Sequence, residues 1–230
     1  MWGLCGPKLE ATSEITGGML RNYTEAASGL SSQMSTQDAT TQIVPARPRR
    51  ADAQRNYEKV LAAAREAFAE GGESTSLEEI ARRADVGIGT LYRNFPNRQA
   101  LLEALYVDEV EEVCRAAADL QEDADPWEAL NSWFERFIGY IATKQALAAE
   151  LLNYLEPDAP LFNVCRGTLF AAGEPLLKRA QEAGVVRSDV SIGDVIQMVV
   201  GIAKIPASEP AQVERLVRVA LDGLRYRPEG

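Results

Sequence analysis

The stretch that decides the fold is residues 76–95, which read SLEEIARRADVGIGTLYRNF. Apolar side chains recur there at helical spacing in two short runs, and residues 85–87 form a turn between them. Ser76 begins the first run with Glu79 three residues later, a pair of residue types that cap a helix N-terminus reciprocally. We predict two short helices with an apolar inner face. Its residues are Leu77, Ile80, Ala81, Val86, Leu91 and Phe95.

The outer side of the second short helix is predicted to carry no carboxylate. It presents Ile88, Thr90, Tyr92, Arg93 and Asn94. A carboxylate on this side would face phosphates at close range, so its absence suits a helix that enters the major groove of DNA. We interpret the two helices as a helix-turn-helix. A packed helical hairpin without a DNA-binding role is the alternative interpretation.

Outward from this stretch the pattern is helical, and no segment shows the alternation of a strand. Gly71 and Gly72 end the helix that begins at Ala51. Asp125 and Pro126 supply a cap and a first-turn proline for a later helix. The predicted fold class is all-α with about nine helices. They cover residues 51–70, 76–84, 88–95, 98–120, 126–143, 145–155, 161–183, 191–205 and 208–225.

Composition divides the 230 residues into three parts. Residues 1–46 are rich in Ser, Thr, Gly and Gln without apolar periodicity, and we predict a disordered tail. Residues 47–100 form the predicted helix-turn-helix domain. Residues 101–230 form a larger helical domain. With 46% hydrophobic and 25% charged residues, the chain has enough apolar material for both cores.

The composition also excludes several functions. The chain has no histidine, which removes Ser-His-Asp and Cys-His catalytic systems and HExxH zinc sites. Its three widely spaced cysteines form neither a metal knuckle nor a disulfide framework, which indicates a reducing, cytoplasmic compartment. No apolar run reaches the roughly 20 residues of a membrane span. We expect no metal, cofactor, membrane association or enzymatic activity; an enzyme that uses Asp, Glu or Tyr is an alternative that the carboxylate spacing does not favour.

The net charge of −10 is unevenly distributed. Residues 45–100 carry ten basic and eight acidic side chains, a net +2, whereas the remainder carries −12. The acidity therefore lies outside the predicted DNA-binding domain. Arg47, Arg49, Arg50 and Arg55 lie on or beside a proline-interrupted arm that suits a minor groove, and solvated charge beside a disordered tail is the alternative.

The same residues resemble a known family. Residues 80–84 read IARRA, and residues 89–98 read GTLYRNFPNR. Together they resemble the DNA-binding signature of the TetR family of bacterial one-component regulators. Residues 183–190 and 213–225 are similar to members with an SbtR-like C-terminal domain. The resemblance implies a homodimeric, sequence-specific DNA-binding transcriptional regulator, a repressor that a small-molecule effector releases from a palindromic operator.

The resemblance also implies roles for individual residues. Tyr92 would place its hydroxyl on the DNA backbone and Ile88 would lie near a thymine methyl group. Arg98 would hold a phosphate beside a positive helix terminus. Gly87 stands where the family often has a serine cap, and Asn94 where histidine is common. The expected DNA-binding residues are Ser76, Gly87, Ile88, Gly89, Thr90, Tyr92, Arg93, Asn94, Arg98, Arg49 and Arg50.

The larger domain carries an aromatic set on its first helices. A ligand cavity in such a domain would be apolar with a few polar groups. Packing in the core is the alternative for each of these side chains. The candidate effector-pocket residues are Trp133, Phe137, Tyr140, Tyr154, Phe162, Cys165 and Leu169.

The last two predicted helices are apolar around much of their circumference, which suggests a second copy of the chain as partner. The candidate dimerisation residues are Val195, Val199, Ile202, Val213, Leu216, Val217, Ala220 and Leu221. A monomer is the alternative if both helices pack inward. For the whole chain, the alternative to a DNA-binding regulator is a helical protein that binds a small molecule or a protein partner but no DNA. Salt-dependent duplex binding distinguishes the two.

Overall fold

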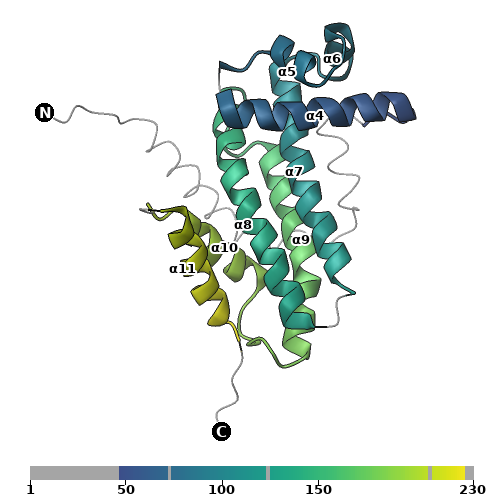
Figure 1. The fold of residues 1–230 in the computed structure, drawn as a ribbon. Coiled ribbons are helices and arrows are strands. Elements are labelled where there is room, and N and C mark those ends of the chain that lie inside the picture. The colour runs from purple at the N-terminus through teal and green to yellow at the C-terminus, as the bar shows by residue number, and fades with distance from the viewer. Residues whose placement is uncertain (1–46, 72–73, 123–124, 207–208, 226–230) are drawn as a thin grey trace, which may run out of the picture. The chain divides into compact units, whose positions relative to one another are not determined.

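The computed structural model describes residues 47–71, 74–122, 125–206 and 209–225. The elements that these residues form are helices joined by turns and loops, and the predicted all-α fold is confirmed (Figure 1). Within the described ranges, β pairing is limited to one isolated antiparallel bridge between Val186 and Arg225. The tail predicted over residues 1–46 lies outside the described residues.

The helices follow the predicted order and most of the predicted boundaries. Pro175 lies within its helix, and the helix continues through it. The bounds are α4 (Ala51–Gly71), α5 (Leu77–Arg83), α6 (Ile88–Asn94), α7 (Arg98–Leu120), α8 (Pro126–Leu151), α9 (Pro160–Glu182), α10 (Ile192–Ala203) and α11 (Pro210–Asp222).

One predicted break is wrong. The sequence predicts separate helices over 126–143 and 145–155, but α8 runs without interruption to Leu151. Residues 140–150 contain neither glycine nor proline, so nothing removes a backbone donor or favours a turn there. The helix ends instead where residues 152–154 turn before Pro157. Its start is as predicted, because the Asp125 carboxylate accepts from the backbone N–H of Trp127 at 2.8 Å and of Glu128 at 3.2 Å.

The chain divides into two compact units. The first unit extends to Leu105 and also includes Leu147–Val164, so it contains α4, α5 and α6 with the start of α7, the end of α8 and the start of α9. The second unit contains Tyr106–Ala146 and the chain from Cys165 onward. Three helices, α7, α8 and α9, therefore contribute residues to both units.

The core of the first unit joins α4, α5 and α6, which contact one another in pairs (Figure 1). Ile80 of α5, Leu91 of α6 and Phe95 are fully buried, as the spacing predicts. The rings of Tyr57 and Phe95 lie 4.9 Å apart between centroids, which brings α4 against the end of α6. Burial of each such side chain stabilises the fold by about 1.5–3 kcal/mol. This core holds the two short helices in place.

The core of the second unit is centred on Trp133 of α8, which is fully buried. Its indole N–H donates to the carbonyl oxygen of Val113 in α7 at 3.1 Å. Its ring stacks on Phe137, with 5.7 Å between centroids. Gly173 of α9 has no side chain where the ring lies, and a Cβ there would be 2.7 Å from Trp133 Cζ3. Trp133 therefore joins α7, α8 and α9 at one point.

Candidate nucleic-acid interface

The turn between α5 and α6 is closed by backbone hydrogen bonds. The N–H of Val86 donates to Ala81 O at 3.1 Å, and that of Asp85 donates to Arg82 O at 3.3 Å. Asp85 has a φ of 55°, the left-handed conformation that this pattern of helix ending requires. Glycine is the usual residue there, and aspartate is tolerated because its short polar side chain can bond locally. The turn sets the direction in which α6 leaves α5.

The outer side of α6 is exposed as predicted. Ile88 is 40% exposed and Tyr92 is 43% exposed, whereas Leu91 on the opposite side is buried. Both side chains lie on a helix of seven residues, so they are exposed on the same short surface. The helix contains no acidic residue. Its outer side therefore combines apolar area with donors and carries no charge that repels phosphate.

The polar side chains of α6 are ordered by bonds within the helix. Arg93 donates to Thr90 Oγ1 at 2.9 Å and to Gly89 O at 3.2 Å. Asn94 donates to Thr90 O at 3.0 Å. The Arg93 guanidinium is thus held along the exposed side, and these two bonds use two of its five N–H donors. A Cβ built on Gly89 meets no atom within 4 Å, so the fold itself does not require glycine at this position.

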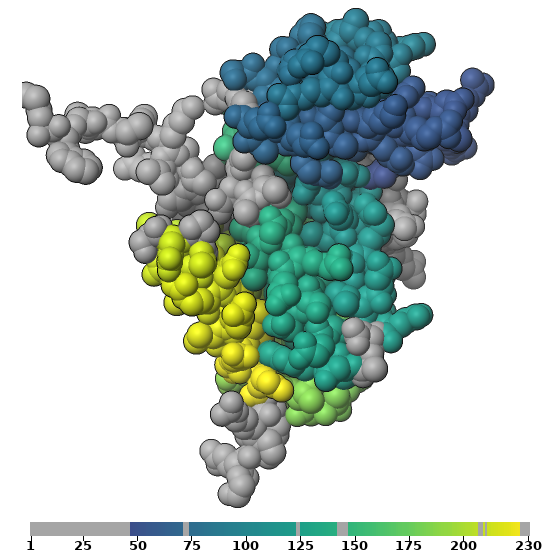
Figure 2. Space-filling view, viewed as in Figure 1, coloured from purple at the N-terminus to yellow at the C-terminus, as the bar shows by residue number. Residues whose placement is uncertain are grey.

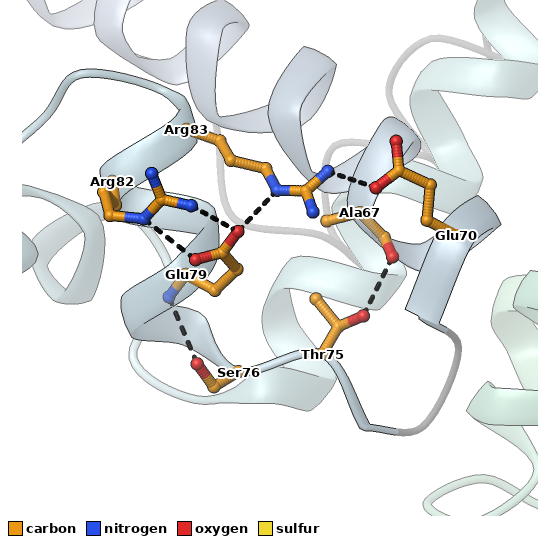
Figure 3. Close-up of polar contacts among 7 residues, drawn as sticks. All are labelled: Ala67, Glu70, Thr75, Ser76, Glu79, Arg82 and Arg83. Carbon is orange, nitrogen blue, oxygen red and sulfur yellow. Dashed lines mark hydrogen bonds and ion pairs between the residues drawn. The ribbon is translucent and has the colours of Figure 1, made fainter.

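The start of α5 is capped by Ser76, whose Oγ accepts from the backbone N–H of Glu79 at 3.1 Å. The predicted reciprocal bond from the Glu79 side chain is replaced by another interaction. The Glu79 carboxylate accepts from Arg83 and Arg82, and each guanidinium approaches it to 2.7 Å (Figure 3). The hydrogen bond from Arg83, followed by that from Arg82, lowers the pKa of Glu79.

Arg83 also bonds Glu70 of α4 at 2.7 Å, so a chain of ion pairs connects α4 to α5 (Figure 3). The hydroxyl of Thr75 donates to Ala67 O at 2.9 Å and is buried. Together these bonds attach α5 and the segment before it to the last turns of α4. The cap residue Ser76 is exposed beside this attachment.

The remaining predicted DNA contacts lie in different environments. Arg49 and Arg50 are exposed just before α4. Arg47 lies with its guanidinium carbon 5.9 Å from the centroid of the Tyr57 ring. Arg98, by contrast, is directed into the first unit, where it donates to Thr75 O and pairs with Glu150 at 2.7 Å. Sequence reasoning did not identify Glu150, because a contact across 52 residues leaves no local pattern.

The candidate effector residues fall in both units. Trp133, Phe137, Tyr140, Cys165 and Leu169 are buried in the second unit, and Phe162 is buried in the first. Tyr154 belongs to the first unit and is 44% exposed.

Tyr106 is a buried residue near Tyr140 that sequence reasoning missed. Burial raises the pKa of both tyrosines, so both hydroxyls remain protonated near neutral pH. Cys114 donates to Thr168 O at 3.7 Å, and burial raises the pKa of its thiol to about 12. A thiol held in that form is a poor nucleophile. No group of His, Cys, Asp and Glu suited to a metal occurs in the part of the chain that the structure describes.

The candidate dimerisation residues also divide into two sets. Val195, Val199, Val217 and Leu221 are already buried within the chain. Ile202, Val213 and Ala220 are half-buried, and Leu216 is 37% exposed. Val219 of α11, which sequence reasoning did not single out, is 70% exposed. α11 lies on the surface of its unit, where its yellow atoms are visible in Figure 2.

Comparisons with known proteins identify both parts of the chain. Residues 60–105 match the family model described as "Bacterial regulatory proteins, tetR family", and residues 125–226 match "Transcriptional regulator SbtR-like, C-terminal domain". A TetR transcriptional regulator from Streptomyces coelicolor is 41% identical in sequence; the match covers 74% of this chain and 98% of that one, with a TM-score of 0.66. The chain belongs to the TetR family. A TetR transcription regulatory protein from Mycobacterium vanbaalenii is 35% identical in sequence. That match covers 78% of this chain and 100% of the other, with a TM-score of 0.64.

A third relative is matched only in part. The Transposon Tn10 TetC protein of Escherichia coli is 31% identical over 86 residues, which are 37% of this chain and 44% of that protein. This chain therefore aligns with less than half the length of that curated relative.

Membership of the TetR family confirms two of the predictions. The protein is a DNA-binding transcriptional regulator with an N-terminal helix-turn-helix module, and it belongs to a family of non-enzymatic proteins. TetR regulators bind DNA operators and dimerise. Among the described helices, none combines the length and the apolar character that a bilayer crossing needs.

Proposed function

We propose that this TetR-family regulator is a cytoplasmic repressor that binds a palindromic operator as a homodimer and leaves it when a small molecule binds. The observation that carries the proposal is the exposed side of α6, where Ile88 and Tyr92 lie beside Arg93 without a carboxylate. Two such helices related by a two-fold axis would enter major grooves about one helical turn apart. We assign α6 as the recognition helix.

The proposed DNA contacts follow from this placement. Tyr92 would donate its hydroxyl to a phosphate, and Ile88 would contact a thymine methyl group. Thr90, Arg93 and Asn94 would reach phosphates or base edges from the same side. Arg49 and Arg50 would extend the contact from the segment before α4. These contacts explain why a chain with a net charge of −10 can bind a polyanion, because the charge near the proposed interface is positive.

The proposed operator contact is tested by selecting duplexes from a random pool and titrating the best one at several salt concentrations. Tyr92→Phe should weaken binding roughly tenfold, because each copy in the dimer loses one hydrogen bond. Arg93→Gln should weaken binding and reduce the slope of log affinity against log salt by about 1 for each phosphate that the guanidinium neutralises. Lys178→Gln removes one charge from an exposed side chain of α9 and is the matched control.

Two outcomes would contradict the proposal. If the wild-type protein binds no duplex in a salt-dependent way, the alternative of a helical ligand-binding or interaction protein is supported. If the wild type binds but the α6 variants behave like Lys178→Gln, another surface contacts DNA.

The proposed dimer forms through α10 and α11. Leu216 and Val219 are the large exposed apolar residues of α11. The buried candidate residues, Val195, Val199, Val217 and Leu221, form a common core of α10 and α11 beneath them. Val219→Glu should reduce the mass measured by sedimentation to that of a monomer, because a charge would be buried at the interface. Ala171→Glu places the same charge on an exposed residue of α9 and should leave the dimer intact. A dimer that survives Val219→Glu would place the interface elsewhere.

The proposed effector acts by favouring a state with lower DNA affinity. A ligand that binds two states equally shifts neither, so the effector must bind the released state more tightly. Trp133, Phe137, Tyr140, Cys165 and Leu169 of the second unit are the proposed contacts. Screening small molecules for a change in operator affinity tests this step, and equal affinity with every compound would leave it without support.

A further inference from the structure

The side chain of Arg98 contacts groups from three other parts of the first unit. Its Nη1 donates to the carbonyl oxygen of Thr75, before α5, and its Nη2 lies 2.7 Å from Glu150 Oε1, at the end of α8. Its guanidinium carbon lies 4.7 Å from the centroid of the Phe68 ring in α4. Arg98 itself begins α7. One side chain therefore connects α4, the start of α5, α7 and α8.

The ion pair between Arg98 and Glu150 is shielded from water. The two side chains are 19% and 11% exposed, whereas those of the Arg83–Glu79 pair are 30% and 32% exposed. Asn153 donates to the second oxygen of the same carboxylate at 3.5 Å. Shielded charges interact more strongly than surface charges, and removing one partner leaves the other desolvated. Breaking this pair should therefore cost more than breaking a surface ion pair.

The bond from Arg98 to Thr75 reaches the DNA-binding helices directly. Thr75 precedes Ser76, the residue that caps α5, and its hydroxyl donates to Ala67 O. The bond from Arg98 to the Thr75 carbonyl is thus one of the contacts that position the start of α5. The position of the guanidinium depends in turn on the Glu150 carboxylate.

We propose that Glu150 is a positioning residue for DNA binding, which acts through Arg98 and the Thr75 carbonyl to fix the start of α5. The proposal rests on the proposed function, because it concerns the affinity of the α5–α6 surface for DNA. It assigns Arg98 to this internal connection, in place of a phosphate contact. Because α8 is one helix that also supplies residues 126–146 to the second unit, a displacement of its end would act on α5 through the same pair.

A phosphate contact and an internal connection predict different results for conservative variants. Arg98→Lys keeps the positive charge that a phosphate needs, but one ammonium group lacks the planar fork that serves Thr75 and Glu150 together. Glu150→Gln keeps an acceptor oxygen near Arg98 and removes only the charge. If Arg98 contacts phosphate, Arg98→Lys should weaken DNA binding only slightly, and Glu150→Gln should leave DNA affinity unchanged or raise it. If the internal connection holds, both should weaken binding.

The test measures the affinity of full-length variants for a duplex selected by the wild type, over a range of salt concentrations. The variants are Arg98→Lys, Glu150→Gln, Arg98→Gln and the double variant Arg98→Gln/Glu150→Gln. We expect each single variant to bind the duplex roughly tenfold more weakly than the wild type. The double variant should bind no more weakly than Arg98→Gln, because both substitutions break the same connection. The slope of log affinity against log salt should stay that of the wild type in every variant. Lys178→Gln is again the control. Wild-type affinity in Glu150→Gln, tighter binding in that variant, or a slope reduced by about 2 in Arg98→Gln, about 1 for each copy in the dimer, would overturn the proposal.

A measurement without DNA separates this proposal from the proposed function. Amide hydrogen exchange of residues 74–84 should be at least several-fold faster in Glu150→Gln and Arg98→Lys than in the wild type, while exchange in α10 stays unchanged. Unchanged exchange at residues 74–84 would overturn the internal connection even if the wild type binds DNA. Absence of wild-type DNA binding, with faster exchange in both variants, would overturn the proposed function while supporting the connection.

Discussion

α6 and α10 show how two helices of one chain are stabilised in different ways. α6 has seven residues, a glycine cap that offers no side-chain acceptor, and Leu91 as its buried residue. α10 has twelve residues, a reciprocal cap between Ser191 and Asp194, and five buried residues. The first depends on its neighbours for its structure and leaves one side exposed. The second satisfies its own terminus and is largely buried.

The two helices together show what a contact surface requires. A helix that must leave a side open for a partner cannot also bury many side chains, so its stability comes from the turn before it and from one anchor. Substitutions at Leu91, Asp85, Ser191 and Gly89 test this contrast, and their expected effects on stability decrease in that order.

Leu91→Ala should destabilise the protein most. Removing a fully buried leucine costs about 2–5 kcal/mol of unfolding free energy, and only Phe95, at the end of α6, would still anchor this helix. Urea unfolding should show the loss, and amide exchange of residues 88–94 should approach that of an unfolded peptide. Val199→Ala in α10 is the comparison, because it should lower global stability while exchange within α10 remains slow. Equal amide exchange rates in α6 of Leu91→Ala and in α10 of Val199→Ala would contradict the difference between the two helices.

Asp85→Val should destabilise the protein by about 1–2 kcal/mol, because a β-branched residue disfavours the left-handed conformation at φ 55°. Asp85→Gly removes that restriction and is the control that should fold at least as well. Thermal unfolding of the two variants measures the difference. Equal stability would mean that the turn does not depend on this conformation.

The α10 cap should depend on pH. The hydrogen bond from the Ser191 hydroxyl, followed by the Ser191 backbone N–H, lowers the pKa of Asp194 below its usual 3.8. A carboxyl group with a lowered pKa stabilises the fold above its unfolded pKa, and that contribution is lost as pH falls through the folded pKa. Ser191→Ala should therefore cost about 1 kcal/mol at pH 7 and less near pH 2. Urea unfolding at both pH values checks this, and an effect that does not change with pH would contradict it.

Gly89→Ala should change stability least and in the opposite direction. Alanine is favoured over glycine within a helix by about 0.5–1 kcal/mol, and the added Cβ meets no atom of the chain within 4 Å. Thermal unfolding should show a small gain. Affinity for the selected duplex should nevertheless fall if the backbone of α6 approaches DNA closely at this position. A variant that is both more stable and fully competent for DNA binding would argue against that close approach.

The parts of the structure that sequence predicts well are governed by local interactions. The spacing of Leu91 and Phe95 against Ile88 and Tyr92 fixes which side of α6 is buried, because helical periodicity needs only a few consecutive residues. The Asp125 cap is local in the same way. The Ser191–Asp194 cap is equally local and visible in the sequence, but we did not identify it.

The parts that sequence reasoning missed depend on distant partners. Nothing near Arg98 in the sequence indicates Glu150, and the proximity of Tyr106 to Tyr140 is set by tertiary packing. Glu79 was predicted to complete a cap, but Arg82 and Arg83 provide stronger, charged donors for its carboxylate. Similarly, the exposure of Val219 follows from which side of α11 packs on α10, and the apolar pattern of that helix alone does not decide it.

The contact between Trp133 and Gly173 limits how two helices can move. Within the second unit, the indole ring occupies the space that any larger residue at position 173 would fill, and Ile192 Cδ1 lies 3.0 Å from the same point. Sliding α8 along α9 by one turn would bring the ring against Leu169 or Leu176 or Leu177, where no such opening exists. The portions of α8 and α9 around Trp133 and Gly173 are therefore held in one register. A displacement of one of them along its axis must move the other as well.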